Sequence, residues 1–174
     1  MAPKHVMYVP GIGKVVGKEK VTRGGVPINV FRAIPYAKPP KGNLRFGLPQ
    51  AFEYGLEATW DFSKKDSTKC KQLNPIFPSS NIVTWFWNLK TSEDCLYLNV
   101  YTPSFPDDNN PNELTVTDLS VLVWFHGGAF CIESNDSTQY GPDFLLDHRV
   151  ILVGVNYRLG PFGFFNLECE DAPG

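Results

Sequence analysis

The stretch "VLVWFHGGAFCIES", residues 121–134, joins a strand-forming run to a pair of glycines, and this junction decides the fold. Residues 120–125 and 150–155 are continuous apolar runs of strand length, a pattern typical of parallel strands that are buried on both faces. Between them, residues 141–149 (GPDFLLDHR) place a proline where a helix would begin, so we expect a short crossover helix. The stretch therefore predicts a βαβ unit.

The residues that end the first run, His126-Gly127-Gly128-Ala129, are candidates for chemistry. In α/β sheets, ligands bind in the crevice outside the C-terminal ends of the strands. Glycines leave no Cβ in the way and reach φ values closed to other residues, so consecutive N–H groups can point into such a crevice. A pair of fixed N–H donors is what acyl-transfer enzymes use to bind an oxyanion. An isolated Gly-Gly pair is more commonly an ordinary turn, so the motif needs support elsewhere.

The preceding chain predicts antiparallel structure. Residues 14–32 contain two β-favouring runs punctuated by glycine, which fit a hairpin. Residues 35–49 hold four prolines and two glycines and are expected to form a surface loop. Residues 61–94 form a long irregular excursion before alternation returns at residues 96–101. The fold class is therefore α/β, with antiparallel N-terminal strands leading into a mostly parallel central sheet.

Composition excludes several classes of function. The chain has 174 residues and a formal net charge of −2, with Lys and Arg scattered, so neither nucleic acid nor a membrane surface is an expected partner. No run of about 18 apolar residues indicates a membrane segment. The four cysteines form no C-x-x-C pair, so we expect no metal site and no cofactor. The totals describe one globular domain or part of a larger one.

Four motifs, in order, resemble the type-B carboxylesterase and cholinesterase family. They are FRAIPYAKPPKGNLRFGLP (31–49), EDCLYLNVYTP (93–103), HGGAF (126–130) and VNYRLGPFGF (155–164). The resemblance implies that residues 1–174 are the N-terminal, incomplete portion of an α/β-hydrolase fold, with no second domain and with a loose N-terminus over residues 1–10. It also implies a serine esterase that acts on small-molecule carboxylic esters.

The resemblance assigns roles to the loop after the first apolar run. The oxyanion donors would be the N–H groups of Gly128 and Ala129, and Gly127 would be the residue that turns the backbone. Many family members have a third glycine where this chain has Ala129, a change that costs little unless its φ is positive. His126 is expected to pack and hydrogen-bond so as to hold the loop, rather than to transfer protons.

The resemblance also implies two links between distant segments. A disulfide would join Cys70 to Cys95, although two unrelated buried thiols are the alternative. Loop-closure entropy gives such a bridge roughly 3 to 4 kcal/mol of stabilisation. Arg45 and Glu93 are similar to the family's buried ion pair, which would tie the proline-rich loop to the segment before Cys95.

Further residues carry weaker indications. Trp85 lies ten residues before Cys95, the spacing of the cholinesterase tryptophan that binds a quaternary ammonium, but Trp87 is a rival and plain aromatic packing is an alternative. Asn135 begins an Asn-Asp-Ser glycosylation sequon. Cys131 and Cys169 are expected to be buried free thiols.

The sequence contains no G-x-S-x-G, the elbow that carries the serine nucleophile of the family. We therefore expect the chain by itself to be inactive; the alternative parent is a catalytically dead, cholinesterase-like adhesion protein. The strand at residues 120–125 would be left as an open sheet edge, which predicts aggregation or dependence on a partner. The disulfide pair and the sequon favour a secreted protein, but residues 1–10 show no signal peptide, so the location stays open.

Overall fold

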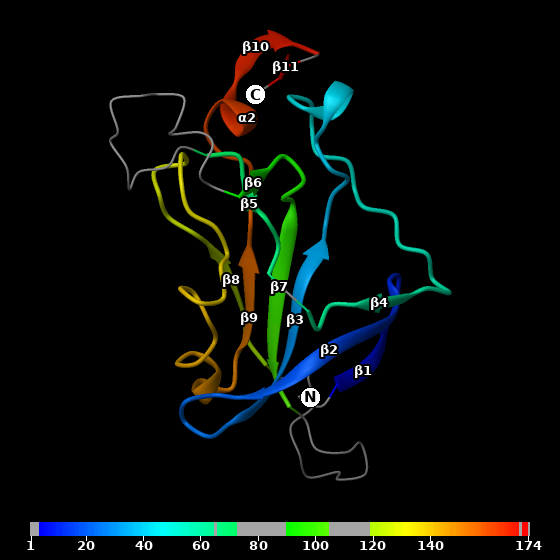
Figure 1. Cartoon of the computed structure of the whole chain (residues 1–174), viewed down its shortest axis with the longest axis vertical. Helices are drawn as coiled ribbons and strands as arrows, with labels where there is room; N and C mark the ends of the chain where they lie inside the picture. The colour runs from blue at the N-terminus through cyan, green and yellow to red at the C-terminus, as the bar shows by residue number, and fades with distance from the viewer. Residues whose placement is uncertain (1–3, 65, 73–89, 105–118, 171, 174) are drawn as a thin grey trace.

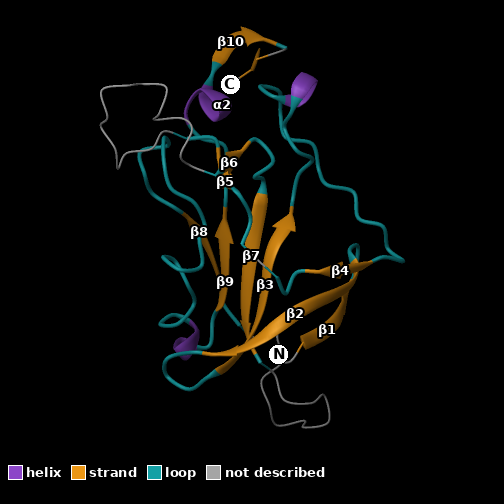
Figure 2. Ribbon diagram, viewed as in Figure 1, coloured by secondary structure: helices purple, strands orange, loops and turns teal. Residues whose placement is uncertain are grey.

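The computed structural model describes residues 4–64, 66–72, 90–104, 119–170 and 172–173. A seven-stranded sheet in the order β1-β2-β3-β7-β9-β8, with β4 paired to β2, dominates them (Figures 1 and 2). Its strands are β1 Lys4–Val9, β2 Gly13–Val21, β3 Pro27–Pro35, β4 Thr59–Asp61, β7 Tyr97–Pro103, β8 Val121–Phe125 and β9 Ile151–Val155. The remaining elements are β5 Lys69–Cys70 with β6 Thr91–Ser92, β10 Asn166–Cys169 with β11 Ala172–Pro173, the 3-10 turns η1 Gly42–Leu44 and η3 Leu146–His148, and helix α2 Gly160–Phe164.

The antiparallel N-terminal part is confirmed, with one correction. Strands β2 and β3 pair as the expected hairpin, and β3 continues the sheet through antiparallel pairing with β7. The loose N-terminus was wrong for residues 4–9, which form β1 and pair with β2 in register from Lys4↔Lys18 to Val9↔Gly13. The turn between them is closed by the N–H of Ile12, which donates to the carbonyl of Val9 at 3.0 Å. The Pro10-Gly11 pair between the two strands is the turn signal in the sequence that indicates this hairpin.

The βαβ unit is present in a reduced form. Strands β8 and β9 pair in parallel over their whole length, from Val121↔Ile151 to Phe125↔Val155. The crossover helix expected over residues 141–149 is wrong except for the 3-10 turn η3. Arg149 follows that turn in the left-handed conformation, with φ 55°, which ends any helical continuation.

Strand β8 is the open sheet edge that the sequence predicts for residues 120–125, and the burial on both faces that its apolar run suggested is not found. It forms the edge of the sheet, with β9 on one side and no described strand on the other. All five of its side chains are exposed, with fractions between 42% for Trp124 and 62% for Phe125. Leu152 on the neighbouring β9 is only 4% exposed. Among the residues that the structure describes, an apolar strand that would suit a sheet centre therefore lies at an edge.

The core is divided among small clusters on the two faces of the sheet. One consists of Ile28, Val30, Tyr101, Leu146 and Leu152, from β3, β7, η3 and β9. A second surrounds the paired cysteines and consists of Ala37, Cys70, Cys95, Leu96 and Leu159. This second cluster holds the proline-rich loop and the end of β9 together at one end of the sheet, next to the candidate site.

Candidate active-site loop

The loop of interest begins where β8 ends. Because β8 and β9 are parallel, both deliver their C-terminal ends to the same edge of the sheet. In Figure 1 that edge faces the end of the molecule that carries α2 and the β5–β6 pair. Residues 126–132 therefore lie at the C-terminal end of the parallel pair, where open α/β sheets bind ligands.

The backbone of this loop is turned into the left-handed region. Gly128, Ala129 and Phe130 have φ values of 105°, 52° and 59°. The carbonyl of Gly128 accepts hydrogen bonds from the N–H groups of Cys131 at 3.0 Å and Ile132 at 3.1 Å, which closes the turn. Neither Gly128 nor Ala129 donates its own N–H to another described residue. The loop thus presents two adjacent donors that the described part of the fold does not use.

The glycine that the turn requires is Gly128, not Gly127 as expected. An added Cβ at Gly128 would lie 2.3 Å from the carbonyl oxygen of Ile132, whereas one at Gly127 would meet nothing within 4 Å. Only Gly128 of the two has a positive φ. Ala129 also has a positive φ, and at such a φ alanine costs about 1 kcal/mol more than the glycine that many family members have there.

His126 lies beneath the loop and is only 3% exposed. Its ring stacks on Tyr157, with centroids 4.4 Å apart and planes 18° from parallel. Its Nδ1 lies 2.9 Å from the carbonyl oxygen of Gly127, and the Tyr157 hydroxyl donates to the His126 carbonyl at 2.7 Å. Burial lowers the pKa of His126 below its usual value, which favours the neutral ring. Because a carbonyl oxygen only accepts, the contact with Gly127 requires the proton on Nδ1. These contacts hold the loop in place.

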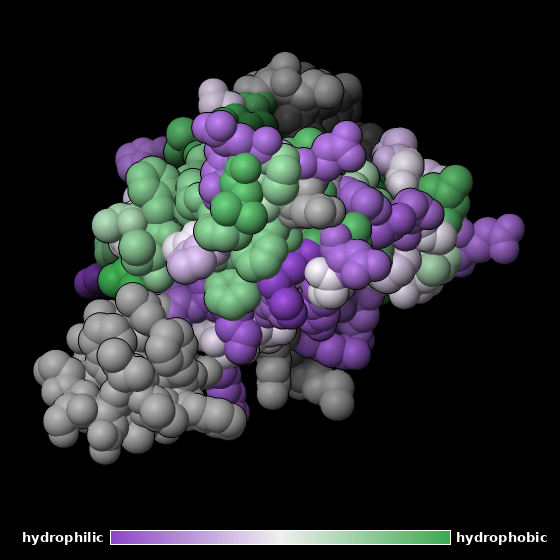
Figure 3. Space-filling view, turned by 90° about the horizontal axis from the view of Figure 1, so that it is seen from above, coloured by the Kyte–Doolittle hydropathy of each residue, from purple (hydrophilic) through white to green (hydrophobic). Residues whose placement is uncertain are grey.

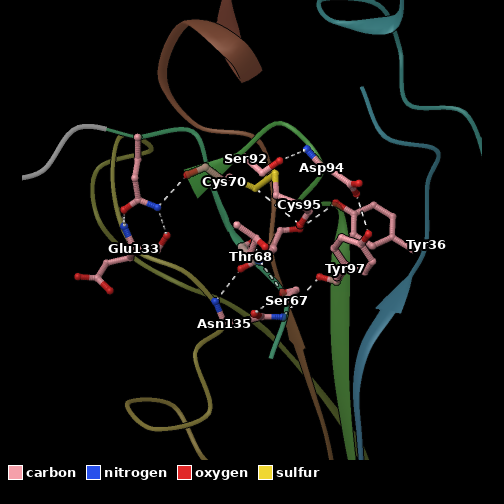
Figure 4. Close-up of a disulfide and its surroundings, with 12 residues drawn as sticks. Tyr36, Ser67, Thr68, Cys70, Ser92, Asp94, Cys95, Tyr97, Glu133 and Asn135 are labelled. Carbon is pink, nitrogen blue, oxygen red and sulfur yellow. Dashed lines mark hydrogen bonds between the residues drawn. A yellow bond between two sulfur atoms is a disulfide. The ribbon is translucent and has the colours of Figure 1, made fainter. Parts of the chain in front are cut away.

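The expected disulfide between Cys70 and Cys95 is present (Figure 4). Its two cysteines are 2% and 1% exposed, with Cα atoms 5.0 Å apart. Two residues beyond the first cysteine, Gln72 makes a paired contact with the backbone of Glu133: its Nε2 donates to the carbonyl and its Oε1 accepts from the N–H, both at 2.8 Å. The disulfide therefore anchors a segment that fastens the far end of the candidate loop. Sequence reasoning did not identify Gln72.

Arg45 and Glu93 form the expected ion pair in a two-pronged geometry. The Arg45 Nε donates to one carboxylate oxygen of Glu93, and its Nη2 donates to the other at 3.1 Å. The pair is half-buried rather than buried, since the side chains are 42% and 16% exposed. Hydrogen bonding to Glu93 raises the pKa of Arg45. Arg158, which follows β9, donates to the Arg45 carbonyl at 2.8 Å, so three family motifs meet here.

Three asparagines support the loop from below, and their exposed fractions are 0% for Asn99, 3% for Asn135 and 1% for Asn156. The Asn135 N–H donates to the Asn156 side chain at 2.7 Å, and the Asn99 side chain donates to the Asn135 carbonyl at 3.0 Å. The side-chain nitrogen of Asn135, Nδ2, donates to the carbonyl of Gly154 at 3.1 Å. The glycosylation prediction at Asn135 is therefore wrong for this folded structure, because the nitrogen that would carry the sugar is buried and bonded.

Other predictions near the loop turn out differently. Cys131 and Cys169 are exposed rather than buried. Cys131 lies between two pockets of about 370 and 340 Å³, which share Gly160 and Pro161 at the start of α2. Trp85 lies outside the described residues. Figure 3 looks onto this end of the molecule, where apolar side chains gather. The exposed apolar residues of this region include Phe130, Phe164, Phe165 and Leu167.

The described residues contain no group of three or more His, Cys, Asp or Glu side chains that could hold a metal ion. No helix among those that the structure describes is long and apolar enough to cross a membrane.

Comparison with known proteins agrees with this geometry. The carboxylesterase family model matches residues 3–174. The chain is 37% identical to juvenile hormone esterase of Tribolium castaneum over 175 aligned residues, which cover 99% of this chain and 26% of that protein. It is 38% identical to liver carboxylesterase 1 of Mus musculus and 36% identical to acetylcholinesterase 1 of Caenorhabditis elegans, and it covers 28% and 24% of their lengths.

The solved structure of juvenile hormone esterase from Manduca sexta, with OTFP covalently attached, superposes with a TM-score of 0.79 at 29% identity. The alignment covers 99% of this chain and 30% of that one. The mixed sheet is thus a partial α/β-hydrolase fold, and the chain spans about a quarter of the length of its curated relatives. The motifs, the sheet order and these similarities lead to one conclusion: the chain belongs to the carboxylesterase family.

Proposed function

We propose that this chain supplies the oxyanion hole of a serine esterase that hydrolyses small carboxylic esters. The observation that supports this most strongly is the turn at Gly128 and Ala129, which frees two adjacent N–H groups from bonding within the described fold. During attack on an ester, negative charge develops on the carbonyl oxygen, and two fixed donors stabilise it. Loss of one such donor in acyl-transfer enzymes costs roughly 2.7 to 4 kcal/mol of transition-state stabilisation.

The supports around the loop fit this role because fixed donors need no reorganisation during the reaction. The stacked His126, the clasp between Gln72 and Glu133, and the asparagines beneath the loop each hold one part of it. The apolar pockets on either side of Cys131 are suited to the uncharged groups of an ester.

Hydrolysis in this family also needs a nucleophilic serine, a histidine base and an acid. The 174 residues contain no G-x-S-x-G elbow, and the buried His126 holds the loop instead of facing a serine. We therefore propose that residues 1–174 by themselves do not turn over esters. A p-nitrophenyl acetate assay of this chain should give the buffer rate, and hydrolysis faster than that of a Gly128→Pro variant would contradict this part of the proposal.

The parent activity is tested by reading the transcript beyond the codon for Gly174. An in-frame Gly-x-Ser-x-Gly, followed by a histidine and an acid further along, would support the esterase. The same fold with the serine replaced would instead support a catalytically dead, adhesion-type protein. The two results are exclusive, so one sequencing experiment separates the two classes of function.

A further inference from the structure

A third cavity, apart from the two pockets beside Cys131, lies on the sheet away from the candidate loop. It has a volume of about 160 Å³, and its polar lining is Lys18, Lys20, Arg32, Tyr101 and Ser137. Strand register explains why these residues meet. Lys18 pairs with Val30, and Val30 pairs with Tyr101, so the three occupy one row across β2, β3 and β7. Lys20 and Arg32 lie two residues further along their strands and therefore share that face.

The position of the row separates this cavity from the proposed oxyanion hole. Tyr101 pairs with Leu152, near the beginning of β9, and Leu152 pairs with Leu122 of β8. The candidate loop follows Phe125, at the opposite end of β8. None of the residues that line the cavity belongs to that loop.

The charges around the cavity leave an excess of positive charge. The carboxylate of Asp143 binds Lys20 at 2.9 Å, and that of Asp66 binds Arg32 at 3.1 Å. Lys18 has no carboxylate partner among the described residues. The cavity therefore has three positively charged side chains and two carboxylates paired with them, and the charge of Lys18 is left over.

Two buried donors at the cavity also have no partner. The hydroxyl of Tyr101, a residue that is 2% exposed, lies near the side chains of Asn99 and Ser137 but has no well-formed hydrogen bond to a described residue. The Nε of Arg32 likewise has no partner in the described part of the chain. Burial, together with the charge of Asp66, raises the pKa of Tyr101 to about 12, so the hydroxyl keeps its proton at neutral pH. A buried donor without an acceptor destabilises the fold, and an anionic ligand would offset that cost.

We propose that this cavity binds a small oxyanion of the phosphate type, held by Lys18, Lys20, Arg32 and the Tyr101 hydroxyl. A phosphate group offers several acceptor oxygens and up to two negative charges, which match the converging donors and the unpaired lysine. The cavity is too small for a drug-sized ligand but has room for a phosphate group with a few further atoms. The phosphate can be free or can belong to a small phosphate monoester.

The test is thermal unfolding of the full chain, followed by tryptophan fluorescence, with increasing inorganic phosphate or glycerol 3-phosphate. Sodium chloride at matched ionic strength controls for general screening. Phosphate should raise the midpoint of the wild-type chain and of Lys14→Gln, which removes an exposed lysine of β2 outside the cavity. A larger shift with glycerol 3-phosphate at equal concentration identifies the monoester as the better ligand, and a smaller one identifies free phosphate.

Two variants test the residues assigned to the site. Tyr101→Phe removes only the unpartnered hydroxyl and should weaken phosphate binding about five- to tenfold. Lys18→Gln, at a partly exposed position, should weaken it similarly and covers the case in which Tyr101→Phe does not fold. The proposal is overturned if phosphate acts no more strongly than sodium chloride, or if both Lys18→Gln and Lys14→Gln respond as the wild type does.

Discussion

Alanine substitution at the two glycines of the candidate loop should have very different effects. At Gly128 the new Cβ would lie 2.3 Å from the carbonyl oxygen and 2.9 Å from the carbonyl carbon of Ile132. These are backbone atoms, and the N–H of Ile132 is itself bonded to the Gly128 carbonyl, so they cannot move away easily. The φ of 105° is a second penalty for any L-residue. Strain and overpacking together give Gly128→Ala a cost of about 2 to 6 kcal/mol.

At Gly127 the same substitution meets open space, because nothing lies within 4 Å of an added Cβ. Gly127→Ala should therefore change the free energy of unfolding by no more than about 0.5 kcal/mol. Urea unfolding followed by fluorescence measures both variants against the wild type. Equal destabilisation by Gly127→Ala and Gly128→Ala would contradict this assignment, because the turn would then be centred on a different residue.

Three further predictions concern the surroundings of the loop. The Cys70–Cys95 disulfide closes a separation of 25 residues, so its reduction should lower the free energy of unfolding by roughly 3 to 4 kcal/mol. Urea titrations with and without dithiothreitol measure this difference, and equal midpoints would argue against an anchoring role. Burial lowers the pKa of His126 in the folded state, so the contribution of this residue to stability is present above about pH 6.5 and is lost as the pH falls through the folded pKa. His126→Gln should therefore flatten the dependence of the free energy of unfolding on pH between pH 7.5 and 5.5. An unchanged dependence would assign it to other groups. Val123→Lys, on the exposed edge strand, should increase the monomeric fraction in light scattering after gel filtration, whereas a wild-type chain that is already monomeric would contradict association through that edge.

Sequence was informative where a residue type has one strong physical meaning. The cysteine pair, the Arg45–Glu93 contact and the hairpin of residues 14–32 were all implied before the structure, through the family resemblance or through alternation. The parallel pairing of residues 120–125 with residues 150–155 also followed from two apolar runs of equal length.

Sequence was less informative where geometry between distant residues decides the outcome. Burial of β8 on both faces was inferred from its apolar residues, but burial requires a neighbour on each side, and composition does not supply one. The open edge at β8 was predicted instead from the family resemblance, which implies a further strand beside it. The sequon at Asn135 is a local pattern, whereas its nitrogen is occupied by the carbonyl of Gly154 on another strand. Which glycine takes a positive φ depends on the return of the chain to Ile132 and could not be read from His-Gly-Gly-Ala alone.

An oxyanion hole at this loop requires that the N–H groups of Gly128 and Ala129 are fixed in place and make no hydrogen bond within the described fold. Amide hydrogen exchange measured by NMR tests this most directly, with the N–H of Ile132, bonded to the Gly128 carbonyl at 3.1 Å, as an internal reference in the same loop. We expect fast exchange at Gly128 and Ala129 and slower exchange at Ile132. Protection of Gly128 and Ala129 equal to that of Ile132 would mean that both donors are already bonded, and it would contradict the oxyanion hole.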